Sequence, residues 1–443
     1  MNQQRKRTFT IAFCALILAC QGLSAQPAKV LTLHEAYELA IANSKQLKLA
    51  QTGVGLAQSA TSLTKTALLP SLDVSLSATY IGNGIIMNRD FSNAQSVWMP
   101  HFGNSFSVEA SQVIFTGGAL ATSIEKNKLE EQVAQLSYSR NELDICFLVT
   151  GYYLDLFKLK NQREVFLKNI EQTELLIQQI KSKESQGMAL GSDVTRHELM
   201  LQNLKLALIE IDNNSRIINN QLVVTLGLSP EIQIVPDPSI LNLDTSKGNS
   251  ANLLQHAIEN LPELRSAALS REIAAKELRI AKADYYPRVA LVASNSFNGP
   301  ILIEVPTINK NFNSWYVGVG VSYNLASLYK TKRKVQVAST RQLAAEYAEA
   351  LAIEQAQVAV HSASTKFKES FEKLTVYETS SRLADENYRI INNSYLNGLV
   401  LITEMLDASN TKLNAELQVV NAKLNVIYSY YRLQREIGSN QNK

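Results

Sequence analysis

The residues best suited to chemistry in this chain are its histidines and acidic side chains, but their spacing does not build an active site. The five histidines are dispersed, and the pairs His34-Glu35 and His197-Glu198 lack the second histidine that a helical zinc site requires. The sequence contains no phosphate-binding Walker loop, no GxSxG turn, no CxxC pair and no HExxH helix. We therefore expect a protein that is not an enzyme and that has no cofactor or metal site.

One pair of acidic residues has a spacing that suggests another kind of chemistry. Glu404 and Asp407 are three residues apart, which places both carboxylates on one face of a helix. If that face lined an aqueous opening, the carboxylates would favour cations and could bind a blocking metal. If it did not, the pair would be a solvated helix end. The residues alone leave both interpretations open.

The N-terminus has the layout of a secretory signal peptide. The basic residues RKR precede an apolar run at Phe9–Ala19, and the small-residue exit LSA ends at Ala25. Cleavage there would divide the chain into a leader, residues 1–25, and a mature protein, residues 26–443. The alternative is a lipoprotein signal with Cys20 as the lipidated residue, which fits less well because leucine precedes Ala19.

Composition excludes several classes of function. Removal of the leader takes away three basic residues and leaves 40 basic and 40 acidic ones, so the mature chain has no formal net charge. This balance gives no support to nucleic-acid binding, which requires a basic surface. Cys146 is the one cysteine outside the leader, and its apolar neighbours favour a core position. No mature segment approaches 18 uninterrupted apolar residues, so we expect no transmembrane helix.

The mature sequence contains an internal repeat. The pattern at Ala40–Asn43 recurs 217 positions later at Ala257–Asn260, and the segment that follows Gly187 recurs 211 positions later, after Gly398. Such self-similarity indicates two copies of one structural unit. The predicted repeats cover about 32–227 and about 250–438, and a proline-containing connector at 228–249 joins them.

Each repeat predicts the same order of elements: a helix of about 35 residues, two strands, a very long helix and a returning helix. Thr32 and Glu35 form a capping-box pattern at the start of the first helix. The first long helix is predicted from about Ala119 to Glu184, which corresponds to about 100 Å. Its apolar residues follow alternating steps of four and three. A heptad pattern of this length favours coiled-coil packing over an ordinary helical bundle.

The first predicted strand, PSLDVSLSATY at Pro70–Tyr80, alternates strictly between apolar and polar residues, and each of the other predicted strands has an apolar face. Each is close to the 9–11 residues that a tilted strand needs to cross a membrane. Aromatic residues such as Tyr80 and Trp315 lie near strand ends, as in the girdles of membrane barrels, and long loops join the strands of each pair. The predicted strands are about 70–80, 105–115, 288–297 and 314–324.

Four strands are too few to close a barrel, which needs at least about eight. An open sheet edge in hydrocarbon would leave backbone groups unpaired, and each would cost several kcal/mol. The strands therefore predict that several chains contribute to one closed membrane pore. The alternative is a small soluble four-stranded sheet with one wet face.

The chain closely resembles the TolC-type outer-membrane efflux proteins, and the likeness covers essentially the whole mature sequence. It rests on LTLHEAYELAIANS in the first helix, VIFTGGALATSIEKNKLE at the strand-to-helix junction, and the paired segments GMALGSDV and GLVLITEML. One departure is NLASL at 324–328, where a phenylalanine and glycines are usual in the family. This departure could alter the local bend below the barrel.

The resemblance implies a mainly α protein with membrane β-structure. Three chains would form a homotrimer with a twelve-stranded β-barrel in the bacterial outer membrane, four strands per chain. A long coiled-coil α-helical barrel would continue it through the periplasm. The implied function is the exit duct of a tripartite efflux or type I secretion system, which passively conducts substrates expelled by an inner-membrane pump or exporter. The implied partners are a periplasmic adaptor, that pump, and outer-membrane lipid.

The alternative is a periplasmic coiled-coil scaffold or adaptor without pore activity. Such a protein would have no reason to carry four amphipathic strands with long loops between them.

The resemblance also assigns roles to the two helix-turn-helix tips. Glu404 and Asp407 match an acidic entrance ring, which in a trimer would contain six carboxylates. Asp193 and Tyr395 match positions at which inter-helix links hold the entrance shut. Met188-Ala189 and Leu399-Val400 are expected to leave apolar side chains exposed at the turns. These turn residues would dock the adaptor, and the alternative is that they only pack the hairpins. The docking candidates are Gly187, Met188, Ala189, Gly398, Leu399 and Val400.

Overall fold

The computed structural model describes residues 28–242, 252–304 and 307–439. The predicted signal peptide, including Cys20 and Ala25, lies outside these residues. The chain divides into two compact units, and each unit takes segments from both sequence repeats. The first unit comprises Met1–Lys48, Ser139–Leu261 and Glu354–Lys443, and the second comprises Leu49–Tyr138 and Pro262–Ile353.

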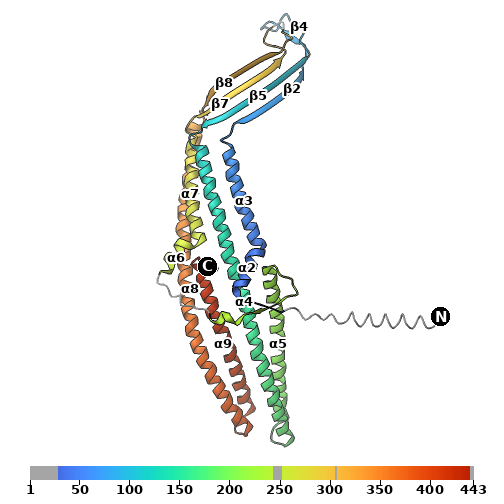
Figure 1. The fold of residues 1–443 in the computed structure, drawn as a ribbon, viewed down its shortest axis with the longest axis vertical. Helices are drawn as coiled ribbons and strands as arrows, with labels where there is room; N and C mark the ends of the chain where they lie inside the picture. Colours follow the sequence, from blue (N-terminus) through green and yellow to red (C-terminus); the bar gives the residue numbers. More distant parts are fainter. Residues whose placement is uncertain (1–27, 243–251, 305–306, 440–443) are drawn as a thin grey trace, which may run out of the picture. The chain divides into compact units, whose positions relative to one another are not determined.

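The described helices occur in the same order in both halves of the sequence (Figure 1). The first long helix begins at the predicted residue and ends one residue beyond the predicted end. The first half contains α2 (Leu33–Asn43), α3 (Lys45–Thr66), α4 (Ala119–Ser185) and α5 (Gly191–Leu226). The second half contains α6 (Leu253–Asn260), α7 (Pro262–Ala283), α8 (Ser327–Leu396) and α9 (Ile402–Glu436).

The helix predicted to open each repeat is interrupted after about three turns in the first repeat and about two in the second. Ser44 leaves the helical conformation with ψ at 122°, and its hydroxyl accepts a hydrogen bond from the Leu47 N–H at 3.3 Å. Serine is a favoured N-cap, so α3 starts as a separate helix. In the second repeat the break falls at Leu261, directly before Pro262, which opens α7. Proline is favoured at the first position of a helix, and its ring disfavours a helical conformation in the residue before it.

The capping box at the start of α2 is confirmed. The Thr32 hydroxyl accepts from the Glu35 N–H at 3.2 Å, and the Glu35 carboxylate accepts from the Thr32 N–H at 2.8 Å. α2 also packs into the core of the first unit. The hydroxyl of Tyr37 in α2 lies 2.5 Å from the hydroxyl of Thr150 in α4. Both residues are buried.

The predicted connector contains a strand that its sequence did not suggest. β6 (Gln233–Pro236) pairs in parallel with β1 (Ala28–Leu31). The Tyr153 hydroxyl of α4 donates to the Leu31 carbonyl oxygen at 2.8 Å and accepts from the Asp237 N–H at 2.8 Å. These bonds attach the small sheet to the first unit. The four residues of β6, QIVP, are too few for an alternating pattern to identify a strand.

The second unit contains a four-stranded antiparallel sheet with the order β2-β5-β7-β8. β5 begins three residues before its predicted start, and β8 ends two residues before its predicted end. A short hairpin, β3 (Gly84–Ile86) with β4 (Gln95–Val97), lies inside the long loop between β2 and β5. The strands are β2 (Ser71–Tyr80), β5 (Phe102–Phe115), β7 (Arg288–Gly299) and β8 (Phe312–Ser322).

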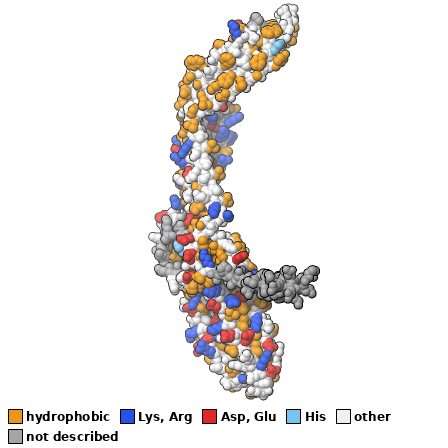
Figure 2. Space-filling view, turned by 45° about the vertical axis from the view of Figure 1, so that its right-hand side comes forward, with side chains coloured by type: hydrophobic (Ala, Val, Ile, Leu, Met, Phe, Trp, Pro, Cys, Tyr) orange, Lys and Arg blue, Asp and Glu red, His pale blue; other side chains and the backbone are white. Residues whose placement is uncertain are grey.

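The register of this sheet separates an apolar face from a polar face. Val74 lies opposite Val108, and hydrophobic side chains gather over the strands (Figure 2). On the other face, hydroxyls meet in a row across the sheet. The Ser75 and Ser107 Oγ atoms are 2.8 Å apart, and those of Ser296 and Ser314 are 2.9 Å apart. Ser107 lies opposite Ser296, so the two serine pairs form one continuous row across the sheet.

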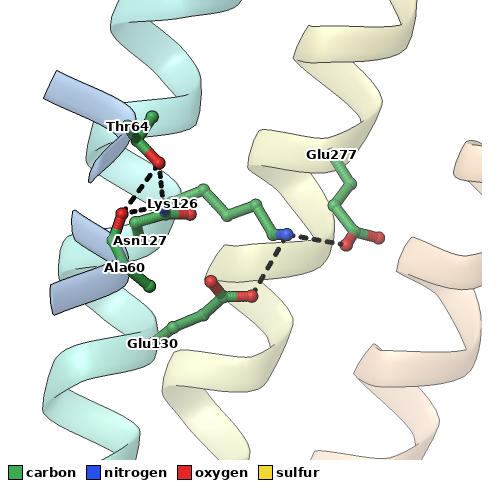
Figure 3. Close-up of polar contacts among 6 residues, drawn as sticks. All are labelled: Ala60, Thr64, Lys126, Asn127, Glu130 and Glu277. Atoms are coloured by element: carbon green, nitrogen blue, oxygen red, sulfur yellow. Dashed lines mark hydrogen bonds and ion pairs between the residues drawn. The ribbon is translucent and has the colours of Figure 1, made fainter. Parts of the chain in front are cut away.

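Charged and polar contacts join the helices of the second unit (Figure 3). The Lys126 ammonium of α4 lies 3.1 Å from the Glu130 carboxylate and 3.5 Å from that of Glu277 in α7. The side-chain amide of Asn127 lies 2.5 Å from the hydroxyl of Thr64 in α3. Three helices are thus joined by partly exposed polar contacts. Among the described helices, none has both the length and the apolar character needed to span a bilayer.

Candidate functional site

The predicted site lies at the two helix-turn-helix tips of the first unit. α4 runs beside α5, and α8 runs beside α9 (Figure 1). Each turn contains a glycine with a left-handed backbone, Gly187 with φ at 73° and Gly398 with φ at 74°. In each turn the next N–H reaches back to a carbonyl near the helix end, from Met188 to Lys183 at 2.8 Å and from Leu399 to Ser394 at 2.9 Å. This is a glycine-terminated helix end, which glycine adopts without steric cost.

The docking candidates at the tips divide into exposed and packed residues. Met188 and Leu399 are exposed, with 66% and 75% of their surface accessible. Ala189 and Val400 are half-buried and pack against the hydrophobic cluster below the turns. The expectation that all four apolar side chains are exposed is therefore wrong for Ala189 and Val400. In their place Leu190 and Leu401, one residue further along, are exposed.

The cluster below the turns joins the two hairpins. Its buried members come from all four helices, and Met405 of α9 is fully buried. The Lys183 ammonium at the end of α4 also donates a hydrogen bond to the Leu396 carbonyl at the end of α8. The hairpins of the two repeats therefore form one packed tip. The buried members are Leu176, Ile180, Val194, Tyr395 and Met405.

Tyr395 is at the centre of this tip and is only 8% exposed. The Tyr395 ring stacks on the ring of His197 in α5, with the centroids 6.5 Å apart. The ammonium of Lys183, at the end of α4, lies 6.0 Å from the centroid of the Tyr395 ring. Burial, with a smaller effect of the Asp193 charge, raises the pKa of the Tyr395 hydroxyl to about 12. Tyr395 therefore remains neutral at physiological pH. The structure brings Asp193 and Tyr395 into one neighbourhood.

His197 is a member of this neighbourhood that the sequence did not reveal. It is 1% exposed, and its Nδ1 lies 3.0 Å from the Asp193 carbonyl oxygen one turn earlier. Burial lowers the pKa of His197 below its ordinary value, although the Asp193 carbonyl and charge act in the opposite direction. The signal in the sequence was the four-residue spacing from Asp193, which places both on one helix face.

Glu404 and Asp407 occupy a different environment. Both are exposed on the first turns of α9, whereas Met405 and Ala408 beside them are buried. Their carboxylates thus point to solvent from one side of the helix, as their spacing predicted. Among the described residues, no group of three or more histidine, cysteine or acidic side chains is placed to hold a metal ion.

Further along α9 lies a buried charge that the sequence also did not reveal. The Lys412 ammonium is 3.2 Å from the Asp385 carboxylate of α8 and 4.4 Å from the centroid of the Tyr388 ring. Lys412 is only 5% exposed. Asp385 also pairs with Arg389 at 2.8 Å. A buried charge requires such partners, so this group fixes the pairing of α8 with α9.

The comparisons with known proteins agree with this architecture. The sequence profile described as "Outer membrane efflux protein" matches residues 253–439. The chain is 24% identical over 277 residues to the pyoverdine export outer membrane protein OpmQ of Pseudomonas aeruginosa, a match that spans 60% of this chain and 56% of the relative. It is 20% identical over 397 residues to the toxin and drug export protein A of Aggregatibacter actinomycetemcomitans, which spans 89% of this chain and 83% of the relative. The chain is therefore similar to outer membrane efflux proteins over much of its length.

A solved structure extends this likeness to the fold. The crystal structure of CusC superimposes with a TM-score of 0.80 at 15% identity and covers 92% of both chains. The predicted fold class, long helices with a four-stranded antiparallel sheet, is confirmed.

Proposed function

We propose that this chain is a non-enzymatic outer-membrane efflux channel, the exit duct of a tripartite export system. Three copies would close a twelve-stranded barrel, and their helices would enclose a tunnel through the periplasm. A periplasmic adaptor and an inner-membrane pump or exporter would deliver the substrate. The two relatives are named for pyoverdine export and for toxin and drug export, so the likeness to them does not select a cargo. A passive duct carries what its pump supplies.

The observation that carries this proposal is the sheet with two unpaired edges. β2 and β8 are the outermost strands, and the face that they share with β5 and β7 is apolar. An apolar face favours lipid, where each unpaired edge group costs several kcal/mol. Pairing of β8 with β2 of a second copy, and of that copy with a third, removes every edge. The barrel of twelve strands that results lies within the range of bacterial outer-membrane barrels.

The chemistry of the packed tip supports a closed entrance. Tyr395 and the Lys183 hydrogen bond join the two hairpins through buried contacts, so opening would have to separate them. Glu404 and Asp407 would line the mouth of the tunnel as six carboxylates. Exposed Met188 and Leu399 at the turns provide apolar surface on which an adaptor could dock.

The proposal is tested with the purified mature protein in detergent and in planar bilayers. We expect the mass of a trimer and discrete conductance steps. A stable monomer that does not insert into membranes would overturn the channel and support a periplasmic scaffold instead.

Docking is tested in intact cells with single cysteines introduced for crosslinking. Met188→Cys and Leu399→Cys are expected to crosslink to the adaptor, because these side chains are exposed at the tips. Leu206→Cys is the matched control, since Leu206 is an exposed leucine of α5 away from the turn. Equal crosslinking from all three positions would contradict docking at the tips. The native Cys146 is buried and does not compete for the reagent.

A further inference from the structure

The loop end of the four-stranded sheet contains a cavity that conduction does not explain. Its volume is about 440 Å³, which falls within the range of about 300–1,000 Å³ that is typical of ligand pockets. It lies where the start of β5 and the connection before it meet the loop between β7 and β8. The residues that matter for its chemistry are Trp98, Phe102, Asn104, Asn309, Lys310 and Asn311.

Part of the cavity lining is aromatic and forms a platform. Trp98 and Phe102 are 61% and 69% exposed, so their rings are accessible to a ligand. His101 lies between Trp98 and Tyr80: its ring stacks on Tyr80 with centroids 5.3 Å apart and meets Trp98 edge-on at 6.1 Å. The His101 Nδ1 is 2.9 Å from the Ile81 carbonyl oxygen, which fixes the ring. The platform is therefore formed before any ligand arrives.

Another part of the lining consists of side-chain amides. Asn104, Asn309 and Asn311 each offer both a hydrogen-bond donor and an acceptor. Gly299 makes room for two of them: a Cβ at this position would lie 2.0 Å from the Asn311 Oδ1 and 3.2 Å from the Asn104 Oδ1. Among the described residues, the lining contains no carboxylate and one lysine, Lys310, so these residues do not repel an anionic group.

This combination matches the chemistry of a saccharide. A sugar ring has an apolar C–H face that can stack on an exposed aromatic ring, and its hydroxyls donate and accept hydrogen bonds as side-chain amides do. Lys310 adds affinity for a sugar that carries a phosphate or carboxylate group. An ordinary apolar ligand would leave the three amides without partners, which is costly.

The place of the cavity in the sheet indicates where such a sugar would come from. Phe102 lies opposite Tyr80 and Asn104 opposite Ala78, in the same register as Leu76 and the rest of the apolar face. In a membrane barrel this face contacts lipid, and aromatic residues near strand ends lie at the level of the headgroups. β5 and β7 are the inner strands of the sheet, so association of copies through β2 and β8 leaves the cavity open.

We propose that this cavity binds the saccharide headgroup of a glycolipid in the outer leaflet. The inference rests on the proposed barrel for its location, whereas the ligand class rests on the cavity itself. Binding would anchor each protomer to the sugar layer of the membrane at a site complete within one chain.

The experiment uses Trp98 as its own reporter. The chain has two tryptophans, and Trp315→Phe leaves Trp98 as the single fluorophore. The purified channel in lipid nanodiscs is titrated with lipopolysaccharide that lacks its O-polysaccharide, with the delipidated core oligosaccharide, and with a phospholipid of matched acyl chains. We expect a saturable change in Trp98 emission with the glycolipid, at least tenfold tighter than with the free oligosaccharide, and none with the phospholipid.

Variants separate recognition from simple proximity. Gly299→Ala, which displaces the two amides, and Asn311→Ala are each expected to weaken binding at least fivefold. Gly320→Ala is the matched control, because the nearest atom to a Cβ there is 3.9 Å away and the substitution has room. Phe91→Ala, an exposed aromatic of the neighbouring loop that does not line the cavity, is a second control.

Each outcome decides between alternatives. Equal binding of the free oligosaccharide would keep the saccharide site and assign it a soluble ligand rather than a membrane one. Equal binding of the phospholipid, or no saturable change with any ligand, would overturn the proposal. Conductance and trimer mass are measured on the same samples. A conducting trimer without sugar binding refutes this inference alone, whereas a non-conducting monomer refutes the proposed channel.

Discussion

The two hairpin tips of the first unit come from equivalent positions of the repeat and yet differ in chemistry. Asp193 in the first tip is followed one turn later by the buried His197, whereas its counterpart Glu404 is followed by the small Ala408. The first tip packs its ionisable groups against Tyr395, and the second exposes its carboxylates. A duplicated hairpin has therefore kept its glycine turn and its apolar core while its polar positions diverged.

The largest effect is expected from the apolar core that both tips share. Met405→Ala removes a fully buried side chain and should lower the free energy of unfolding by about 2–5 kcal/mol. Leu401→Ala, four residues earlier and 70% exposed, is the control and should change it by less than about 0.5 kcal/mol. The free energy of unfolding of both variants is measured by denaturant titration, with hydrogen exchange at the tip as the readout. Equal losses would show that the tips are not packed together.

The next effect concerns the residue that joins the tips. Tyr395→Phe keeps the ring and removes the hydroxyl, and a hydroxyl hydrogen bond between the hairpins would contribute about 0.5–1.5 kcal/mol. If these contacts hold the entrance shut, the open fraction should rise about twofold to tenfold, measured as leak conductance in planar bilayers. Tyr347→Phe in the second unit is an exposed control. Unchanged leak in Tyr395→Phe would remove this residue from gating.

A third effect is a pH dependence that His197 gives to the first tip and that the second tip lacks a histidine to produce. The pKa of His197 is lowered by burial, so the packed tip excludes the protonated ring. The contribution of neutral His197 to the stability of the packed tip is therefore fully present above the ordinary histidine pKa of 6.5. This contribution is lost as the pH falls through the lower pKa that His197 has in the packed tip. Leak conductance should rise between pH 8 and pH 5. His197→Gln should reduce this rise, and His361→Gln, an exposed histidine of α8, should not.

Periodicity predicted most of the fold because the elements are long and regular. The helix from Ala119 and the four alternating strands were placed to within a few residues. The break at Ser44 was missed, since a single N-cap does not interrupt an apolar pattern. β6 was missed because its partner β1 is about 200 residues away and supplies the pairing that its own sequence does not specify.

The candidate site was predicted in part, and only with the help of family likeness. Spacing alone placed Glu404 and Asp407 on one face. Burial of His197 depends on the crossing of α5 with α8, and burial of Lys412 depends on Asp385 in another helix. Such tertiary contacts leave no local signal. The exposure of Ala189 and Val400 was misjudged for the same reason, because residues beside a turn can face inward.

The smallest effect tests the charge that distinguishes the second tip. Glu404→Gln with Asp407→Asn removes exposed carboxylates, whose interaction with a passing cation in water is about 0.4–1 kcal/mol. The preference for potassium over chloride should fall about twofold to fivefold, read from reversal potentials. Because salt screens such charges, the loss should be larger at 0.01 M than at 1 M salt. Asp193→Asn, the equivalent change in the first tip, should alter leak rather than selectivity, because Asp193 lies beside Tyr395 and influences its pKa. If Asp193→Asn changed selectivity as much as the double variant, both tips would line the opening and the contrast between them would be lost.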